Sequence, residues 1–217
     1  LDNLISLIAS ARIGGVLSGK AGIVNIHLGD GKNGFSTIRQ ILEKSDIPRH
    51  HIIPTHVNRN YQLLSQGFDY AKEGGCIDLT ASGYVEGLDD PRTKCSKALK
   101  LALEEGVTMD QVSLSSDGQG SLPVYNQNGE HDGFKVGSCK SLFNEIRDAI
   151  RQEDIPLEVA ITTITRNPAR MYRLPGKGNI APGFDADIVL LSKDFAIKSV
   201  ISSGRIYNDG IYLSDEK

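Results

Sequence analysis

The sequence predicts an α/β protein in which parallel strands alternate with helices. Four apolar, β-rich runs occur along the chain, and each is followed by a polar loop and an amphipathic helical pattern. Consecutive strand–helix units require parallel strands, and strands covered by helices on both faces read as continuous apolar runs. An open doubly wound sheet and part of a (β/α)₈ barrel both fit this pattern. In either architecture, ligands bind at the carboxyl ends of the strands.

The elements follow in a regular order. The chain begins with Leu rather than Met, and residues 1–12 already show helical spacing of apolar residues, so we expect a piece of a longer protein. The predicted strands are residues 21–28, 51–57, 76–82 and 111–117. The predicted helices begin near Ser36, after Asn60, around Cys95 and around Leu142.

The pattern changes in the last third of the chain. Residues 118–133 read as a long loop, and "LEVAITTITRN" (157–167) reads as a helix despite its β-branched residues. Asn167 then suits the N-cap of a further helix, with Pro168 at its first position. Beyond that point, short strands between glycine turns predict a small β element instead of another strand–helix unit.

Composition excludes several classes of partner. The 217 residues suit one large domain, with or without a small appendage, and the formal net charge is −3 with a pI of about 6.0. This charge gives no reason to expect nucleic acid or a membrane surface as a partner. Three cysteines without a CxxC pair are typical of reduced thiols, which favours a cytoplasmic location.

Polar side chains mark the ends of three of the four strands. His27 ends the first, His56 ends the second, and Asp117 ends the fourth, whereas the third offers only Asp78, Thr80 and Ser82. Two imidazoles and a carboxylate converging at one mouth are typical ligands of a catalytic zinc-type ion. The sequence therefore predicts a metal site formed by His27, His56 and Asp117. The alternative is that each histidine is a hydrogen-bonded structural residue.

Three polar residues at or just beyond the strand ends could take part in a hydrolytic reaction. Asp117 could take a proton from water and deliver it to a leaving amine. Arg59 could bind a substrate carboxylate with its planar guanidinium, or it could be a surface ion-pair residue. Ser121 follows Gly118 and Gly120, and a turn role is the simpler interpretation. His50 and His51 precede their strand, and we expect both to be solvated loop residues.

Several short strings resemble the amidohydrolase superfamily. They are "NIHLGD", "PTHVNRN", "LSSDGQGS" and the closing "GKGNIAPGFDADIVLL…VISSGRIYNDG". Within the superfamily, "THVNRN" and "SSDGQGS" most resemble the isoaspartyl (β-aspartyl) dipeptidase family. The resemblance covers nearly the whole chain but only the later part of a full-length member.

The resemblance implies a fold, a cofactor and roles for the candidate residues. The fold would be a partial TIM-like (β/α)₈ metal-dependent hydrolase barrel made of the later strands, in residues 1–172, plus part of a small β-sandwich in residues 173–217. His27 and His56 match histidines that bind one of two zinc ions, and Asp117 matches the aspartate that binds the other and acts on the bridging hydroxide. Arg59 and Ser121 match residues that hold the α-carboxylate of an isoaspartyl dipeptide.

The resemblance also implies groups that this sequence does not supply. They are an HxH pair, a carbamylated lysine and further substrate-binding residues from earlier segments, so we expect this chain to be inactive by itself. The expected partner is a small peptide, and the expected assembly is a homo-oligomer. Two alternatives remain: another amidohydrolase, such as a cyclic amidase or deacetylase, or a metal-free scaffold that kept the fold.

Overall fold

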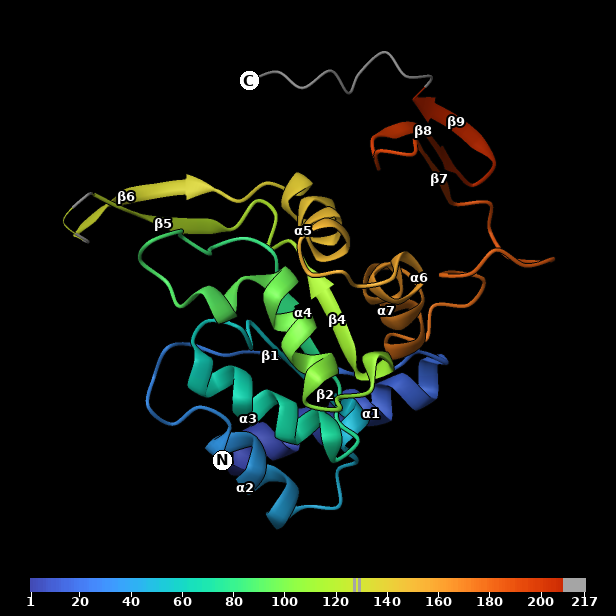
Figure 1. Ribbon diagram of the computed structural model, residues 1–217. Helices are drawn as coiled ribbons and strands as arrows, with labels where there is room; N and C mark the ends of the chain where they lie inside the picture. The colour runs from blue at the N-terminus through green and yellow to red at the C-terminus, as the bar shows by residue number, and fades with distance from the viewer. Residues whose placement is uncertain (127, 129, 209–217) are drawn as a thin grey trace.

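A row of four short parallel strands forms the centre of the molecule (Figure 1). The computed structural model describes residues 1–126, 128 and 130–208. The strands are β1 (Val24–His27), β2 (Ile52–Thr55), β3 (Ile77–Thr80) and β4 (Val112–Ser115). The predicted α/β class with parallel strands is therefore confirmed. No closed barrel forms among the residues that the structure describes.

Strand register brings the carboxyl ends of the strands to the same edge. β1 pairs with β2 in parallel so that His27 lies opposite Thr55, and β3 pairs with β4 so that Thr80 lies opposite Ser115. Since parallel strands all point the same way, the residues that follow them gather at that edge. The predicted site residues belong to these strand ends.

The buried carboxylate of Asp78 connects three of the strands. It accepts hydrogen bonds from Thr55 Oγ1 at 2.5 Å, Ser115 Oγ at 2.5 Å and Ser113 Oγ at 2.9 Å. The backbone oxygen of Asp78 also accepts from Val57 N at 3.2 Å, which brings β3 beside β2. Burial raises the pKa of Asp78, while the hydroxyl hydrogen bonds act in the opposite direction. Asp78 thus has a structural role beneath the strand ends.

Helices flank the strands, and all but the first of them are amphipathic. They are α1 (Asp2–Ser18), α2 (Ser36–Lys44), α3 (Tyr61–Lys72), α4 (Cys95–Glu104) and α5 (Lys140–Arg151). The predicted start of α3 is confirmed, because the Asn60 side chain caps it by accepting from Leu63 N at 2.8 Å. The helix ends before Gly74, whose φ of 92° suits glycine. Apolar side chains such as Phe68 and Leu99 face the strands and form the main core.

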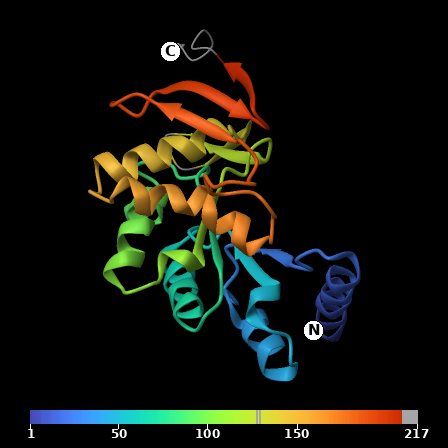
Figure 2. The same ribbon diagram turned by 90° about the vertical axis from the view of Figure 1, so that its right-hand side faces the viewer.

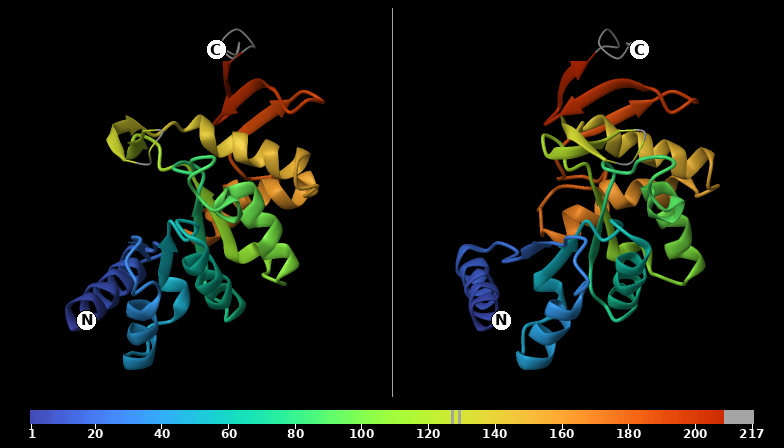
Figure 3. Two further views of the ribbon diagram at one scale, coloured as in Figure 1. Left: turned by 60° about the vertical axis from the view of Figure 1, so that its left-hand side comes forward. Right: turned by 90° about the vertical axis from the view of Figure 1, so that its left-hand side faces the viewer.

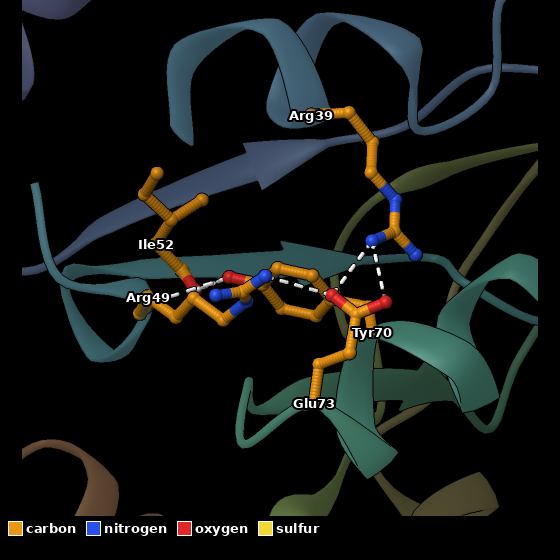
Figure 4. Close-up of polar contacts among 5 residues, drawn as sticks. All are labelled: Arg39, Arg49, Ile52, Tyr70 and Glu73. Atoms are coloured by element: carbon orange, nitrogen blue, oxygen red, sulfur yellow. Dashed lines mark hydrogen bonds and ion pairs between the residues drawn. The ribbon is translucent and has the colours of Figure 1, made fainter. Parts of the chain in front are cut away.

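A polar cluster fixes α3 to the start of β2 (Figure 4). The Tyr70 hydroxyl lies 3.1 Å from the carbonyl oxygens of both Arg49 and Ile52. The Glu73 carboxylate accepts from Arg39 Nη1 at 2.7 Å and from Arg49 Nη2 at 2.8 Å. Figure 4 shows the two guanidinium groups converging on Glu73. The end of α3, α2 and the segment before β2 are thereby connected.

Three expectations about local structure are wrong. The predicted loop 118–133 contains a hairpin, β5 (Ser121–Tyr125) and β6 (His131–Val136), whose glycines hid the strand pattern. Asn167 lies inside α7 (Arg166–Met171), because its buried side-chain amide donates to Met109 O and Val112 O instead of capping a helix. His51 is buried in a short 3₁₀ helix, with Nδ1 2.8 Å from Gly22 O.

The remaining 3₁₀ turns and short helices connect the units. They are η1 (Arg49–His51), η2 (Pro91–Thr93), η3 (Met109–Gln111), α6 (Leu157–Ala160) and η4 (Ile161–Ile164). The predicted helix over 157–167 therefore divides into α6, η4 and the start of α7.

An antiparallel sheet lies at one end of the molecule, on the far side of α5 from the parallel strands (Figure 2). Its strands are β7 (Ile188–Leu191), β8 (Ile197–Ser202) and β9 (Arg205–Asn208). The predicted small β element is thus present, and residues 209–217 of that unit lie outside the described residues. At the opposite end, α1 lies beside the edge strand β1 (Figure 3).

In the part of the chain that is described, no helix has the length and apolar character to cross a membrane.

Candidate active site

A cavity of about 170 Å³ lies at the carboxyl ends of the strands. Four of the five predicted site residues line it: His56, Arg59, Asp117 and Ser121. His56 and Arg59 come from the loop after β2, Asp117 from the loop after β4, and Ser121 from the start of β5. The cavity thus gathers an imidazole, a guanidinium, a carboxylate and a hydroxyl from three segments.

His27, the fifth predicted residue, meets the site through His56. His27 Nδ1 lies 2.9 Å from His56 Nε2, and the two rings meet edge to face with their centroids 4.8 Å apart. Two imidazole nitrogens bound to one tetrahedral zinc ion lie roughly 3.3 Å apart, given zinc–nitrogen bonds of about 2.0–2.1 Å. The 2.9 Å separation is that of a hydrogen bond between the two rings, and it is close to the spacing of two ligands of one ion.

The environment of His56 favours a neutral imidazole. Burial lowers the pKa of His56, and the positive charge of Arg59 lowers it further, while Asp117 acts in the opposite direction. On its other side, His56 Nδ1 lies 2.7 Å from Thr80 Oγ1. A metal-binding imidazole has to be neutral, so this environment suits a ligand.

The backbone is in the left-handed region at two of the candidate residues. The φ angle is 64° at His56 and 49° at Asp117, a conformation that costs non-glycine residues about 1–3 kcal/mol each. Around Asp117 it is held by a hydrogen bond from Gly120 N to Asp117 O at 3.0 Å. A Cβ at position 137 would lie 2.6 Å from Asp117 O. The chain that follows the hairpin can therefore approach this loop so closely only because residue 137 is glycine. Such strain is typical of functional sites.

Arg59 and Ser121 are exposed residues of the cavity lining. Arg59 Nη1 is 4.0 Å from Asp30 Oδ2, and the Arg59 side chain is 41% exposed, so this ion pair is loose and screened by solvent. Ser121 is exposed at the start of the hairpin. An anionic group entering the cavity would find the guanidinium accessible, and the serine also lines this cavity.

The donor set fits a zinc-type ion only in part. His27 and His56 supply two converging nitrogens, and Asp117 supplies a carboxylate in the same cavity. Among the described residues, however, no three His, Cys, Asp or Glu side chains are arranged closely enough to hold a metal ion. A catalytic zinc takes three protein ligands. The two histidine nitrogens fit as ligands, but they do not complete this set.

The third strand plays a different part from the other three. Of the polar candidates predicted there, Thr80 contacts His56, Asp78 has the structural role described above, and Ser82 Oγ donates to Ser116 O at 2.5 Å. Sequence reasoning missed Asn58, a buried residue that lines the cavity. Its position two residues after His56, inside "THVNRN", was the available signal.

Comparisons with known proteins support the resemblance to the amidohydrolase family. The pattern of the amidohydrolase family matches residues 34–207. Beta-aspartyl dipeptidase from the thermophilic keratin-degrading Fervidobacterium islandicum AW-1 is similar in two crystal structures. The structure in complex with beta-Asp-Leu dipeptide has a TM-score of 0.86 and 40% identity, over 100% of this chain and 56% of that chain. The other has a TM-score of 0.81 and 37% identity, over 99% of this chain and 54% of that chain.

A more distant relative matches a shorter segment. N-acetylglucosamine-6-phosphate deacetylase from Lysinibacillus sphaericus is 27% identical over 89 residues, which are 40% of this chain and 23% of that protein. The chain thus spans about half the length of the solved structures and less than a quarter of this relative.

Proposed function

Because the chain belongs to the amidohydrolase family, we propose that it forms part of a zinc-dependent β-aspartyl dipeptidase. The observation that carries the proposal is the cavity at the strand ends, where His56, Arg59, Asp117 and Ser121 lie together. The likeness to beta-aspartyl dipeptidase at 40% identity over the whole chain supports the substrate class. The substrate would be a dipeptide in which aspartate is joined through its side-chain carboxyl group.

Each residue would have a defined task. His27 and His56 would hold a zinc ion as two of its ligands, and Asp117 would be a further ligand and the proton carrier. When bound, the ion would lower the pKa of a water molecule towards ~7 and polarise the scissile carbonyl. Asp117 would take the proton of the attacking water and deliver it to the leaving amine, a role worth roughly 10²–10⁴-fold in rate.

Arg59 and Ser121 would select the substrate. The Arg59 guanidinium would bind the α-carboxylate through charge-assisted hydrogen bonds, and Ser121 would donate a further one. Asp30, 4.0 Å from Arg59, is too loosely paired to compete strongly for it. Since a cyclic amide has no free carboxylate, these two residues favour a dipeptide over a cyclic-amidase substrate.

The remaining ligands of the site would come from residues outside this chain. We propose that residues 1–172 form the later part of a (β/α)₈ barrel and that residues 173–217 form part of a small β-sandwich. The four parallel strands and the separate antiparallel sheet are compatible with this division. The active unit would then be the complete protein, as a homo-oligomer, and not this chain by itself.

A substrate panel tests the proposal. The complete protein is loaded with zinc and assayed by amine release from β-Asp-Leu, α-Asp-Leu and N-acetylglucosamine 6-phosphate. A dihydropyrimidine is assayed in parallel by the loss of its ring absorbance, because its hydrolysis gives a ureido acid and no free amine. Hydrolysis of β-Asp-Leu in clear preference to the others is expected. Preference for the sugar phosphate would favour a deacetylase, as the Lysinibacillus sphaericus relative suggests. No turnover together with no bound zinc would favour a metal-free scaffold.

A further inference from the structure

Both ring nitrogens of His56 have a buried or partly buried partner. Nε2 lies 2.9 Å from His27 Nδ1, on the side where the two imidazoles converge. Nδ1 lies 2.7 Å from Thr80 Oγ1, on the side of β3, where both residues are buried. An imidazole with one nitrogen held in this way has a defined ring orientation, because the ring cannot turn without breaking the contact.

Thr80 is itself fixed by a side chain from the same loop as His56. Thr80 N donates to Asn58 Oδ1 at 2.7 Å, and Asn58 Nδ2 donates back to Thr80 O at 3.0 Å. Asn58 Nδ2 also donates to Thr93 O at 2.9 Å. The amide therefore pairs with the backbone of Thr80 as a neighbouring strand would. Strand pairing by backbone is interrupted here, since the chain turns through φ 64° at His56.

The other hydroxyls nearby have different partners. Thr55, Ser113 and Ser115 all donate to the carboxylate of Asp78. Among the hydrogen bonds of the described residues, the Thr80 hydroxyl is thus the one directed at His56 Nδ1. Thr80 is also β-branched, so its hydroxyl has a restricted choice of direction.

We propose that Thr80 is a positioning residue for His56 and that Asn58 anchors it. The Thr80 oxygen accepts the hydrogen bond of His56 Nδ1–H, so that Nε2 carries the lone pair and presents it beside His27. This inference rests on the proposed function, because it treats His56 Nε2 as the metal-binding atom. It adds to that function a residue that sets the tautomer and the direction of a ligand.

Two substitutions at Thr80 and one matched control test the proposal in the complete protein. Thr80→Val keeps the shape and removes the hydroxyl, whereas Thr80→Ser keeps the hydroxyl. Thr163→Val removes a hydroxyl from another buried threonine, in η4, where Thr163 Oγ1 donates to Ala160 O at 2.7 Å. The control therefore carries the same chemical change and a similar loss of one buried hydrogen bond.

Two readouts separate positioning from a general loss of stability. The first is the ¹⁵N NMR signature of the His56 ring in the metal-free protein, assigned by comparison with His56→Gln. The second is the zinc dissociation constant, measured by competition with a chelator. We expect Thr80→Val to shift the ring from the Nδ1–H to the Nε2–H form and to weaken zinc binding by roughly 10- to 100-fold. Thr80→Ser and Thr163→Val should keep the Nδ1–H form of His56. Their zinc dissociation constants should stay within about threefold of that of the unmodified protein.

The outcomes distinguish this inference from the proposed function. An unchanged His56 tautomer and unchanged zinc affinity in Thr80→Val would overturn the positioning role, even if β-Asp-Leu is hydrolysed. A shifted tautomer with weaker zinc binding would support it, even if β-Asp-Leu proves not to be the substrate. If Thr163→Val weakened zinc binding as much as Thr80→Val, the effect would be general and the inference would be wrong.

Discussion

Substitution of Arg59 by alanine is expected to lower kcat/KM for β-Asp-Leu by roughly 10- to 150-fold. A hydrogen bond to a charged group contributes about 1.5–3 kcal/mol, and each 1.36 kcal/mol corresponds to about a tenfold change in rate. Arg59 lines the cavity at the strand ends and has only the loose contact to Asp30 at 4.0 Å, so no strong internal ion pair is lost with it. The loss therefore reports on substrate binding and not on folding.

The assay uses two substrates and a matched arginine. Besides β-Asp-Leu, the complete protein is given an analogue in which the α-carboxylate is an amide. The unmodified protein should lose about as much on the analogue as Arg59→Ala loses on β-Asp-Leu, and the variant should barely distinguish the two. Arg166 is the control, because its side chain is similarly exposed, at 48%, and it does not line the cavity. Its ion pair with Asp110 has a length of 2.8 Å.

Two results would refute this reasoning. Arg59→Ala could retain full kcat/KM, which would mean that the guanidinium does not bind the substrate. Alternatively, the variant could still discriminate against the amide analogue as strongly as the unmodified protein. The carboxylate would then be recognised by another group.

Further predictions concern stability. Glu73→Gln should lower the free energy of unfolding by about 1 kcal/mol at neutral pH, since Glu73 binds both Arg39 and Arg49 at a partly exposed site. These arginines, Arg39 foremost, lower the pKa of Glu73 from its ordinary 4.5. The difference in the free energy of unfolding between the variant and the unmodified protein should therefore be full above pH 4.5. It should vanish as the pH falls below the folded-state pKa of Glu73. Urea titration at several pH values measures this difference, and a value that does not change with pH would contradict the prediction. Gly67→Ala should destabilise by about 1–3 kcal/mol despite the better helix propensity of alanine, because the new Cβ would lie 2.2 Å from Val57 Cγ1. Thermal unfolding checks this, and an increase in Tm would show that Val57 can move aside.

The repeating part of the fold could be predicted from the sequence. Apolar runs followed by helical periodicity indicated four parallel strands, and the polar residues after them indicated a site, because parallel strands end at one edge. The hairpin 121–136 could not be predicted, since its glycines and polar residues read as loop. Asn167 is a residue type typical of an N-cap, and only tertiary contacts show that its amide binds the backbone of the first residue of η3 and of the residue after η3.

The candidate site could be predicted in part, again because parallel strands end at one edge of the sheet. Residue type and position at a strand end indicated His27, His56 and Asp117, but not how the rings would be oriented. Hydrogen bonds of 2.7 and 3.0 Å join Asn58, in the loop after β2, to Thr80 at the end of β3, and such contacts leave no periodic signal in a sequence. His51 was misassigned because burial of a polar ring depends on one distant acceptor, Gly22 O.

The dependence of β-Asp-Leu hydrolysis on bound zinc tests the central claim most directly. The complete protein is stripped with a chelator and dialysed, and kcat/KM is then measured before and after the addition of zinc. We expect activity to disappear on stripping and to return in proportion to the zinc bound, since His27 and His56 would then regain the ion on which they converge. Equal hydrolysis by the stripped and the reloaded protein would contradict a metal site at these strand ends.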